Sequence, residues 1–387
     1  MGLSQRIALV LVLFAVAPRA SALDVYFAGF AWLGDAAALD AHYPYSRALN
    51  RHPGSGVAPL DAAVAARLRA ATFEGFTLKF DELGSLGPDS PSALALAFVL
   101  DRETVSVETI GDTRKILVEL AGQALFFDFR ESAVIATFPV VNQYLHVKKS
   151  AVTAEDIAPI VRDMYLGANG VNILDDFTRT LGTMTLNPNV TRRIQVTEVK
   201  FEPALRALLP EHFARDDSGF RNALAQDFSK YLSAAQGIPV LPYSVGSAIA
   251  NRMAGRFSDG TVFDLRIPEA DYSISLDLRN LRKIEFERST AGTSYVYGAY
   301  LNVRATEPLS NTVFLDATIK NGASKIVPAS QTEVNDWPAY HEALLALMEK
   351  FSAALTKPDA AWAAKHSENA AVVKEMKTLQ KVLQSCK

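Results

Sequence analysis

Cysteine is almost absent from this sequence. The chain has 387 residues and one cysteine, Cys386, which is the penultimate residue. A disulfide within the chain is therefore excluded, and so is a metal site built from several thiolates. The fold must be stabilised by packing. We interpret Cys386 as an exposed, incidental thiol in a frayed tail, and pairing with another chain is the alternative.

Signatures of metal and nucleotide sites are also missing. The six histidines stand singly, without His-x-x-x-His or His-Glu-x-x-His spacing. The acidic pairs Asp175-Asp176 and Asp216-Asp217 lack the alternating pattern of a calcium loop. Neither Gly-x-x-x-x-Gly-Lys-Ser/Thr nor Gly-x-Gly-x-x-Gly occurs. The sequence predicts no metal and no cofactor.

Charge of one sign is not in excess. The formal net charge is −3, and the isoelectric point is near 6.1. This balance offers no broad positive field for nucleic acid, which is therefore not expected as a partner. Hydrophobic residues make up 49% of the chain and charged residues 21%, as in an ordinary globular protein.

The only apolar run without charges near an end of the chain has the pattern of an export signal. Arg6 precedes an apolar core over Ile7 to Ala17, and Ala20-Ser21-Ala22 matches a small-x-small cleavage site. The core is shorter than the roughly 18 to 20 residues that span a bilayer. We predict a signal peptide over residues 1–22 and an exported protein without a transmembrane segment after cleavage. The periplasm is the expected compartment, and an extracellular location is the alternative.

The remaining length favours two domains, since about 100 to 200 residues form one domain. Both halves alternate strand patterns with amphipathic helices, so we predict an α+β fold in which each domain has an antiparallel or mixed sheet with helices on one face. The predicted division is an N-terminal domain over 23–168, a linker over 169–193, a C-terminal domain over 194–357 and a helical tail over 358–387.

Within the first half, residues 93–147 carry the alternation of an antiparallel meander. Helices are expected around 60–68 and from Thr153 to Gly167. The segment 42–59 is rich in Pro, Gly and Ser and is expected to be irregular.

The second half begins with a strand pattern over 194–201 and a helix that Gly237 ends. We expect a buried strand over 238–241, a short helix that ends at Gly255, and then a second meander. Both halves thus run strand, helix, strand, meander, which indicates a structural duplication without shared residues.

In the tail, Val372, Met376, Leu379 and Leu383 fall on one narrow helix face. This face is expected to pack on its own domain, and self-association through it is the alternative.

Ser244 is the one candidate nucleophile. It follows an apolar run and precedes an expected helix, as the serine of a hydrolase does, and Gly246 supplies a small residue two positions on. Pro242 fits the strained turn poorly, and the chain that follows is a meander instead of alternating strands and helices. Ser244 or Ser247 is better interpreted as the residue that caps a helix.

One loop is a candidate for ligand binding. His42, Tyr43, Tyr45 and Arg47 stand close together and can line a site, because functional residues are over-represented in loops. Tyrosines packed against a sheet edge explain the same residues equally well.

The order of elements from Ile194 to Gly322 resembles that of bacterial envelope-assembly proteins of the curli-secretion lipoprotein and penicillin-binding-protein activator type. The resemblance covers about a third of the chain and carries no functional residue over. It implies docking to another envelope protein in the periplasm. We predict a non-catalytic exported protein that acts by binding; a secreted serine hydrolase using Ser244 and a periplasmic small-molecule-binding protein are the alternatives.

Overall fold

The computed structural model describes residues 23–34, 39–51, 57–80, 93–110, 112–167, 170–184, 186–187, 192–215, 217–243, 252–329, 331 and 334–387. The predicted signal peptide and Ser244 lie outside these residues. Helices make up 36% and strands 41% of the structure, in two sheets with helices and a C-terminal helical region. The predicted α+β class is confirmed.

The first half of the chain contains five strands and five helices among the described residues. They are β1 (Leu23–Leu33), α1 (Leu39–His42), α2 (Pro44–Leu49), α3 (Pro59–Ala70), β2 (Phe76–Lys79), β3 (Leu94–Ile110), β4 (Thr113–Asp128), β5 (Ala133–Lys148), α4 (Ala154–Leu166) and α5 (Ile173–Thr183). The meander predicted over 93–147 corresponds to β3, β4 and β5, each a single long strand.

The second half begins at β6 and ends in helices. Its elements are β6 (Ile194–Phe201), the 3₁₀ helix η2 (Pro203–Leu208), α6 (Glu211–Arg215), α7 (Asp217–Gln236), β7 (Arg252–Phe257), β8 (Val262–Arg266), β9 (Tyr272–Arg288), β10 (Gly292–Glu307), β11 (Thr312–Pro328), α8 (Trp337–Ala354), α9 (Ala360–His366) and α10 (Val372–Gln384).

Two sheets organise the molecule. The first sheet has the order β2-β1-β3-β4-β5-β8-β7, and β7 also pairs with β1, so that six of its strands close into a ring. The second sheet has the order β11-β10-β9-β6. Strands β7 and β8 come from the second half of the sequence but belong to the first sheet. The chain therefore returns to the first sheet after it has begun the second.

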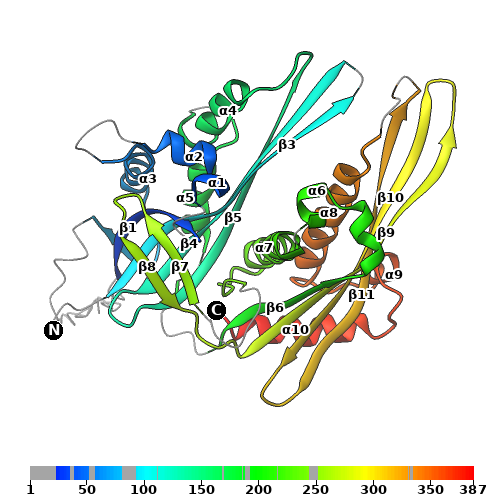
Figure 1. Cartoon of the computed structure of the whole chain (residues 1–387). Helices are drawn as coiled ribbons and strands as arrows, with labels where there is room; N and C mark the ends of the chain where they lie inside the picture. The colour runs from blue at the N-terminus through cyan, green and yellow to red at the C-terminus, as the bar shows by residue number, and fades with distance from the viewer. Residues whose placement is uncertain are drawn as a thin grey trace, which may run out of the picture.

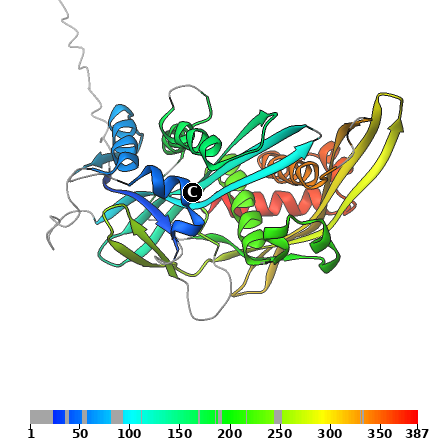
Figure 2. The ribbon, with the colours of Figure 1, turned by 45° about the horizontal axis from the view of Figure 1, so that its top comes forward.

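The sheets and helices alternate in layers (Figures 1 and 2). Helices α3, α4 and α5 cover one face of the first sheet, and their apolar side chains share a core with β1, β3, β4 and β5. Helices α7, α8 and α10 share a core with the second sheet. Helix α7 also contacts β5, so the helices of the second half lie against the uncovered back face of the first sheet.

The two halves repeat one topology. In the first, β1 pairs in parallel with β3, and β3, β4 and β5 follow as an antiparallel meander. In the second, β6 pairs in parallel with β9, and β9, β10 and β11 follow in the same way. Helices that contact the sheet come after each meander, α4 and α5 after the first and α8, α9 and α10 after the second. The structure thus supports the predicted duplication.

Irregularities in the strands recur at matching positions. The pairing skips Asp101, the eighth residue of β3, and Arg279, the eighth residue of β9. It also skips Ile135 and Phe314, the third residues of β5 and β11. Such bulges bend a strand and re-aim its side chains, and a chance match of several is not expected.

The turns before β5 and β11 match as well. Ser132 has φ 46° and Asn311 has φ 55°, and each stands immediately before its strand. They are the two non-glycine residues with positive φ in the described part of the chain. The left-handed region is unfavourable for a residue with a Cβ, and asparagine tolerates it better than serine.

The bulge at Asp101 reverses the face of the sheet to which the later side chains of β3 point. Leu96 and Phe98 point into the core under α3–α5, and an unbroken alternation would send Arg102 and Thr104 to the same side. Because Asp101 is an extra residue, Arg102 and Thr104 instead point to the back face, toward α7. The bulge lets β3 continue past Asp101 as one strand.

The segment predicted as a buried strand and a short helix differs from the prediction. Ile238, Val240 and Leu241 are buried, but the segment forms only one bridge, from Leu241 to Gln195. Residues 252–255 belong to strand β7 and not to a helix. Gly255 is required by close packing, because a Cβ there would lie 2.4 Å from the carbonyl oxygen of Trp32 and 2.5 Å from the Phe263 ring.

The region expected to be irregular, 42–59, contains helix α2. Pro44 supplies a fixed φ at the start of this helix, and the Glu103 carboxylate accepts hydrogen bonds from the backbone N–H groups of Tyr45 and Ser46, both at 2.8 Å. The cap comes from β3, 57 residues along the chain. Local sequence therefore gave no sign of it.

The C-terminal tail packs on its own domain. Val372, Met376, Leu379 and Leu383 are buried, and α10 contacts β11. Cys386 is also buried, with 1% of its surface exposed, so its interpretation as an exposed thiol was wrong. Burial raises the pKa of this thiol to about 12.

Candidate functional site

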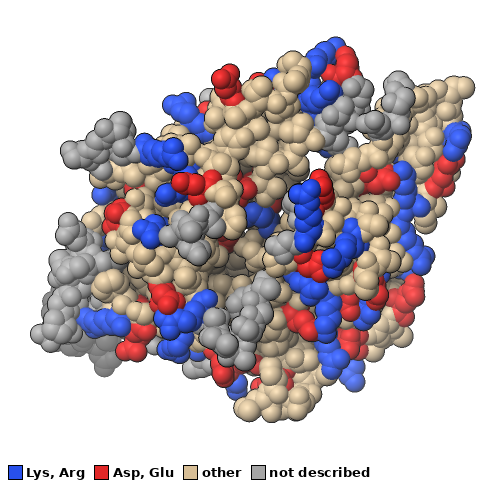
Figure 3. Space-filling model, in the orientation of Figure 1, with Lys and Arg blue, Asp and Glu red and all other residues tan. Residues whose placement is uncertain are grey.

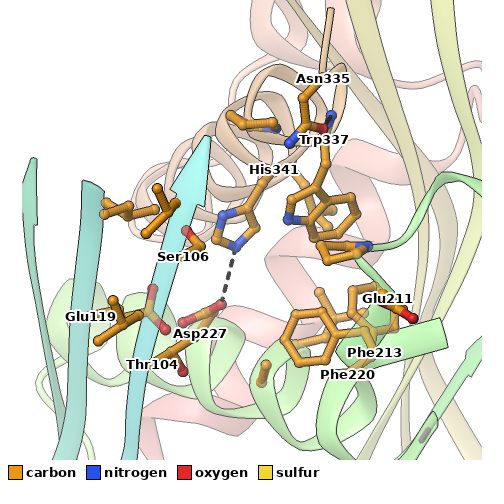
Figure 4. A pocket seen from close by; sticks show the side chains of 18 of the residues that line it. Thr104, Ser106, Glu119, Glu211, Phe213, Phe220, Asp227, Asn335, Trp337 and His341 are labelled. Atoms are coloured by element: carbon orange, nitrogen blue, oxygen red, sulfur yellow. Dashed lines mark hydrogen bonds and ion pairs between the residues drawn. The ribbon is translucent and has the colours of Figure 1, made fainter. Parts of the chain in front are cut away.

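A cleft lies where the back face of the first sheet meets the helices of the second half. Its volume is about 400 Å³. Strands β3 and β4 form one wall, and α6, α7 and the start of α8 form the other (Figure 4). The cleft is the part of the back face that α7 and the β7–β8 hairpin leave uncovered.

Strand pairing explains which residues of β3 and β4 line the cleft. Thr104 pairs with Glu119, and Ser106 pairs with Leu117. Paired residues point to the same face of a sheet, so all four face the cleft. The residues between them on β4, such as Val118, are buried under α4 and α5. Alternate residues of β4 thus face the cleft and the core.

Aromatic rings form the apolar part of the opposite wall. The ring centroids of Phe213 and Phe220 lie 5.5 Å apart, and the Phe220 and Trp337 centroids 5.8 Å apart. Leu224 and Leu344 also line this wall. The edge-to-face and tilted geometry stabilises the rings against one another and keeps them on one side of the cleft.

Charged side chains form the floor. The Arg102 guanidinium donates to Glu119 Oε1 from Nε at 2.9 Å and from Nη2 at 2.5 Å. It also donates to Gln226 Oε1 at 3.0 Å, which ties β3 to α7. Gln143 donates to the other oxygen of Glu119. Burial acts to raise the pKa of Glu119, but the Arg102 charge and the facing His341 hold it below its usual range.

His341 and Asp227 complete the floor. The His341 ring stacks on Trp337 with centroids 5.5 Å apart and planes 14° apart. Its Nε2 lies 3.8 Å from Asp227 Oδ2, and Arg102 Nη2 lies 3.6 Å from Asp227 Oδ1. Figure 4 shows His341 and Asp227 pointing toward each other across the cleft. Both separations are longer than a hydrogen bond.

The cleft also holds a serine, a histidine and an aspartate, so we compared it with a catalytic triad. In a triad, hydrogen bonds link the nucleophile to the base and the base to the acid. Here the His341–Asp227 separation is 3.8 Å, and among the described residues no hydrogen bond joins Ser106 to His341. The described residues therefore do not form the hydrogen-bonded chain of a triad.

The four residues of the predicted ligand loop lie elsewhere, on α1, α2 and the residue between them. Tyr43 is buried, and its hydroxyl lies 2.8 Å from the carbonyl of Leu33 and 2.9 Å from that of Asp101. Burial, followed by the nearby Asp101 and Glu103, raises the pKa of this phenol. Tyr43 therefore has a structural contact that accounts for its position.

The other loop residues are more accessible. His42 is exposed, and Tyr45 is half-buried. Arg47 pairs with Asp40 at 3.0 Å, and its guanidinium lies 4.8 Å above the Trp32 ring. Arg47 and Trp32 line a separate hollow of about 550 Å³. None of the four loop residues lines the cleft, and a ligand role for the loop stays a prediction.

Sequence reasoning missed the residues of the cleft floor. Asp227 stands on the apolar stripe of α7, seven residues after Phe220 and three after Leu224, where a buried carboxylate is unusual. This position in the sequence could have indicated that Asp227 belongs to a site. Arg102 and His341 gave none, because the Asp101 bulge and the packing of α8 bring them to the cleft.

Surface charge gives no competing site on the face shown in Figure 3, where acidic and basic side chains are interspersed. Among the described residues, no group of three or more histidine, cysteine or acidic side chains is placed to hold a metal ion. No helix in the described part of the chain has the length and apolar character to cross a membrane.

Comparison with known proteins finds weak structural likeness only. No protein-family model matches the chain, and no curated protein matches it. A DUF330 protein from Xanthomonas campestris is 14% identical with a TM-score of 0.24, and the match covers 44% of this chain and 88% of that one.

Two further solved structures are of the same kind. A putative neuraminyllactose-binding hemagglutinin homologue from Helicobacter pylori is 12% identical with a TM-score of 0.26, covering 57% of this chain and 95% of that one. A minor lipoprotein from Acinetobacter baumannii is 9% identical with a TM-score of 0.22, covering 43% and 90%. These neighbours are bacterial proteins, and one of those named here is a lipoprotein. They are not of the curli-secretion or penicillin-binding-protein activator type.

Proposed function

We propose that this chain is an exported bacterial envelope protein that acts by binding rather than by catalysis, with the cleft between its two halves as the binding site. The observation that carries the proposal is an apolar wall that no described element covers. Phe213, Phe220 and Trp337 line a hollow of about 400 Å³, within the range of small-ligand sites, roughly 300 to 1,000 Å³.

The apolar surface continues beyond the cleft along β5. Leu145 and Val147 are 52% and 56% exposed and pair with Leu117 and Lys115 of the cleft wall. Neighbouring exposed apolar residues mark binding surfaces more often than isolated ones do. The cleft with this extension suits an elongated, largely apolar ligand, or an apolar segment of another envelope protein.

Binding of a neutral apolar fluorophore tests the proposal. N-phenyl-1-naphthylamine brightens in apolar surroundings, so its fluorescence should rise and saturate with the folded protein. Ala223 is 7% exposed on the cleft wall, and Ala223→Leu fills the space that the probe would occupy. We expect this variant to weaken probe binding about tenfold or more, because steric exclusion forfeits the apolar burial.

A matched control is Ala62→Leu, which makes the same change at an exposed position of α3, away from the cleft. It should bind as the unaltered protein does. Absence of saturable binding by folded protein would overturn the binding function. Unchanged binding by Ala223→Leu would overturn the assignment to the cleft.

A serine hydrolase remains the competing function, and it has a direct test. A fluorophosphonate probe labels an activated serine, and labelling lost in Ser106→Ala or Ser244→Ala would identify it. We expect no labelling of Ser106, because its neighbours lack the hydrogen bonds that activate a nucleophile.

A further inference from the structure

The floor of the cleft has an excess of negative charge. Two carboxylates, those of Glu119 and Asp227, face the single guanidinium of Arg102 there, and the His341 ring lies 3.8 Å from Asp227. At the mouth, Glu211 pairs with Arg215. The floor therefore has one more carboxylate than guanidinium groups.

The two carboxylates are not equivalent. Glu119 accepts two hydrogen bonds from Arg102 and one from Gln143. Asp227 is only 4% exposed, and its nearest cations lie at 3.6 and 3.8 Å. In the described part of the structure, no residue donates a hydrogen bond to its carboxylate. The uncompensated group is therefore Asp227.

Asp227 lines the cleft, so a hydrogen-bond donor on a ligand can supply the bond that no described residue donates. Asp227 Oδ2 points toward His341 across the open part of the cleft (Figure 4). A group that enters the cleft beside His341 reaches the carboxylate directly.

We propose that the ligand of the cleft carries a primary ammonium or a guanidinium group that donates to Asp227, with an apolar body held between Leu224 and the rings of Phe220 and Trp337. This inference rests on the proposed binding function and specifies its ligand. The aromatic rings support the same choice, because a ring face attracts a cation.

Two sources provide this chemistry. One is a free amphipathic amine, and the other is a lysine or arginine beside an apolar residue in a partner protein. The shared element is a cationic donor joined to an apolar group. The test therefore uses a small molecule and a peptide side by side.

The first measurement compares 4-phenylbutylamine, which is protonated at pH 7, with 4-phenylbutan-1-ol, both by calorimetry. A hydrogen bond to a charged group contributes about 1.5 to 3 kcal/mol, so the amine should bind about ten- to 100-fold more tightly. The second pair is an N-acetylated Phe-Lys-Phe amide and its norleucine analogue. Whichever cationic compound binds more tightly identifies the source.

Asp227→Asn should remove the preference for the cation and keep the affinity for the neutral alcohol, since the shape of the side chain is retained. Glu211→Gln is the matched control, because Glu211 lines the same cleft but is exposed and paired with Arg215. It should keep the preference. If Asp227→Asn does not fold, the comparison of amine and alcohol in the unaltered protein still decides the question.

The outcomes separate the two proposals. Equal binding of amine and alcohol would overturn the cationic ligand and leave the binding function standing. Failure of all four compounds and of the fluorophore to bind would overturn both. A preference that survives Asp227→Asn would place the cation at another group.

Discussion

At the residue scale, two aspartates show how position decides the role of the same side chain. Asp101 is the extra residue of the β3 bulge, and its carboxylate has one hydrogen-bond donor, Gln123 at 3.1 Å. Burial raises its pKa to about 7, although Gln123 and Arg102 act in the opposite direction. Asp156 caps α4, accepts from Thr153 and pairs with Lys148, and these bonds lower its pKa to about 2.

These shifts predict opposite dependences of stability on pH. For Asp101 the folded pKa is raised, so its stabilising contribution is complete below about pH 4 and is lost as the pH rises through 7. Asp101→Asn should therefore flatten the fall in the free energy of unfolding between about pH 4 and pH 7, measured by urea titration.

Asp156→Asn is the control of opposite sign. The folded pKa of Asp156 is lowered, so its contribution is present above about pH 4 and is lost as the pH falls through 2. This variant should be less stable than the unaltered protein at pH 7. A pH profile unchanged by Asp101→Asn would contradict the burial of that carboxylate.

At the scale of elements, the turns before β5 and β11 have the same backbone conformation but different residues. Ser132 and Asn311 both adopt positive φ, but only asparagine is well suited to it. The difference between the turns lies in the side chain and not in the backbone. Exchanging the residues therefore isolates its contribution.

Ser132→Asn should stabilise the protein and Asn311→Ser should destabilise it, each by about 0.5 to 1 kcal/mol, since left-handed backbone costs about 1 to 2 kcal/mol and asparagine recovers part of it. Thermal unfolding followed by circular dichroism measures both. Changes of the same sign would show that side-chain contacts, not backbone conformation, dominate these turns.

Local patterns predicted the elements whose partners are near in sequence. The alternating pattern identifies β3, β4 and β5 as strands. The apolar stripes identify α4, α7, α8 and α10 as helices. Helix α2 depends on Glu103 from a distant strand, and β7 depends on space beside Trp32 for Gly255. The cleft depends on the Asp101 bulge. These contacts are non-local, so no window of sequence contains them.

At the scale of the whole molecule, the two predicted domains share strands. Strands β7 and β8 close the ring of the first sheet, with β7 paired to both β8 and β1, and they follow β6 and α7 of the second half. A division at residues 169–193 separates them from the ring. This segment also contains α5, which packs on β4 and β5. The two-domain division stays a prediction.

We expect the fragment 23–193 not to fold alone, because it lacks β7 and β8 and leaves the buried charges Arg102 and Glu119 without α7. Circular dichroism should show no cooperative thermal transition. Addition of the fragment 194–387 is the control and should restore the transition. A cooperative transition of 23–193 by itself would favour independent domains.

The stacking of the two halves has a further consequence for how such units assemble. The helices of one unit rest on the back of the other unit's sheet, which is a head-to-tail contact, and contacts of this kind continue into filaments unless something ends them. The corresponding face of the second sheet is polar and charged, with Lys200, Asp277, Arg304 and Asp316 across it. Docking an apolar helix layer there would desolvate these charges. We therefore expect this face to end the stack after two units, as the polar outer face of a terminal repeat does.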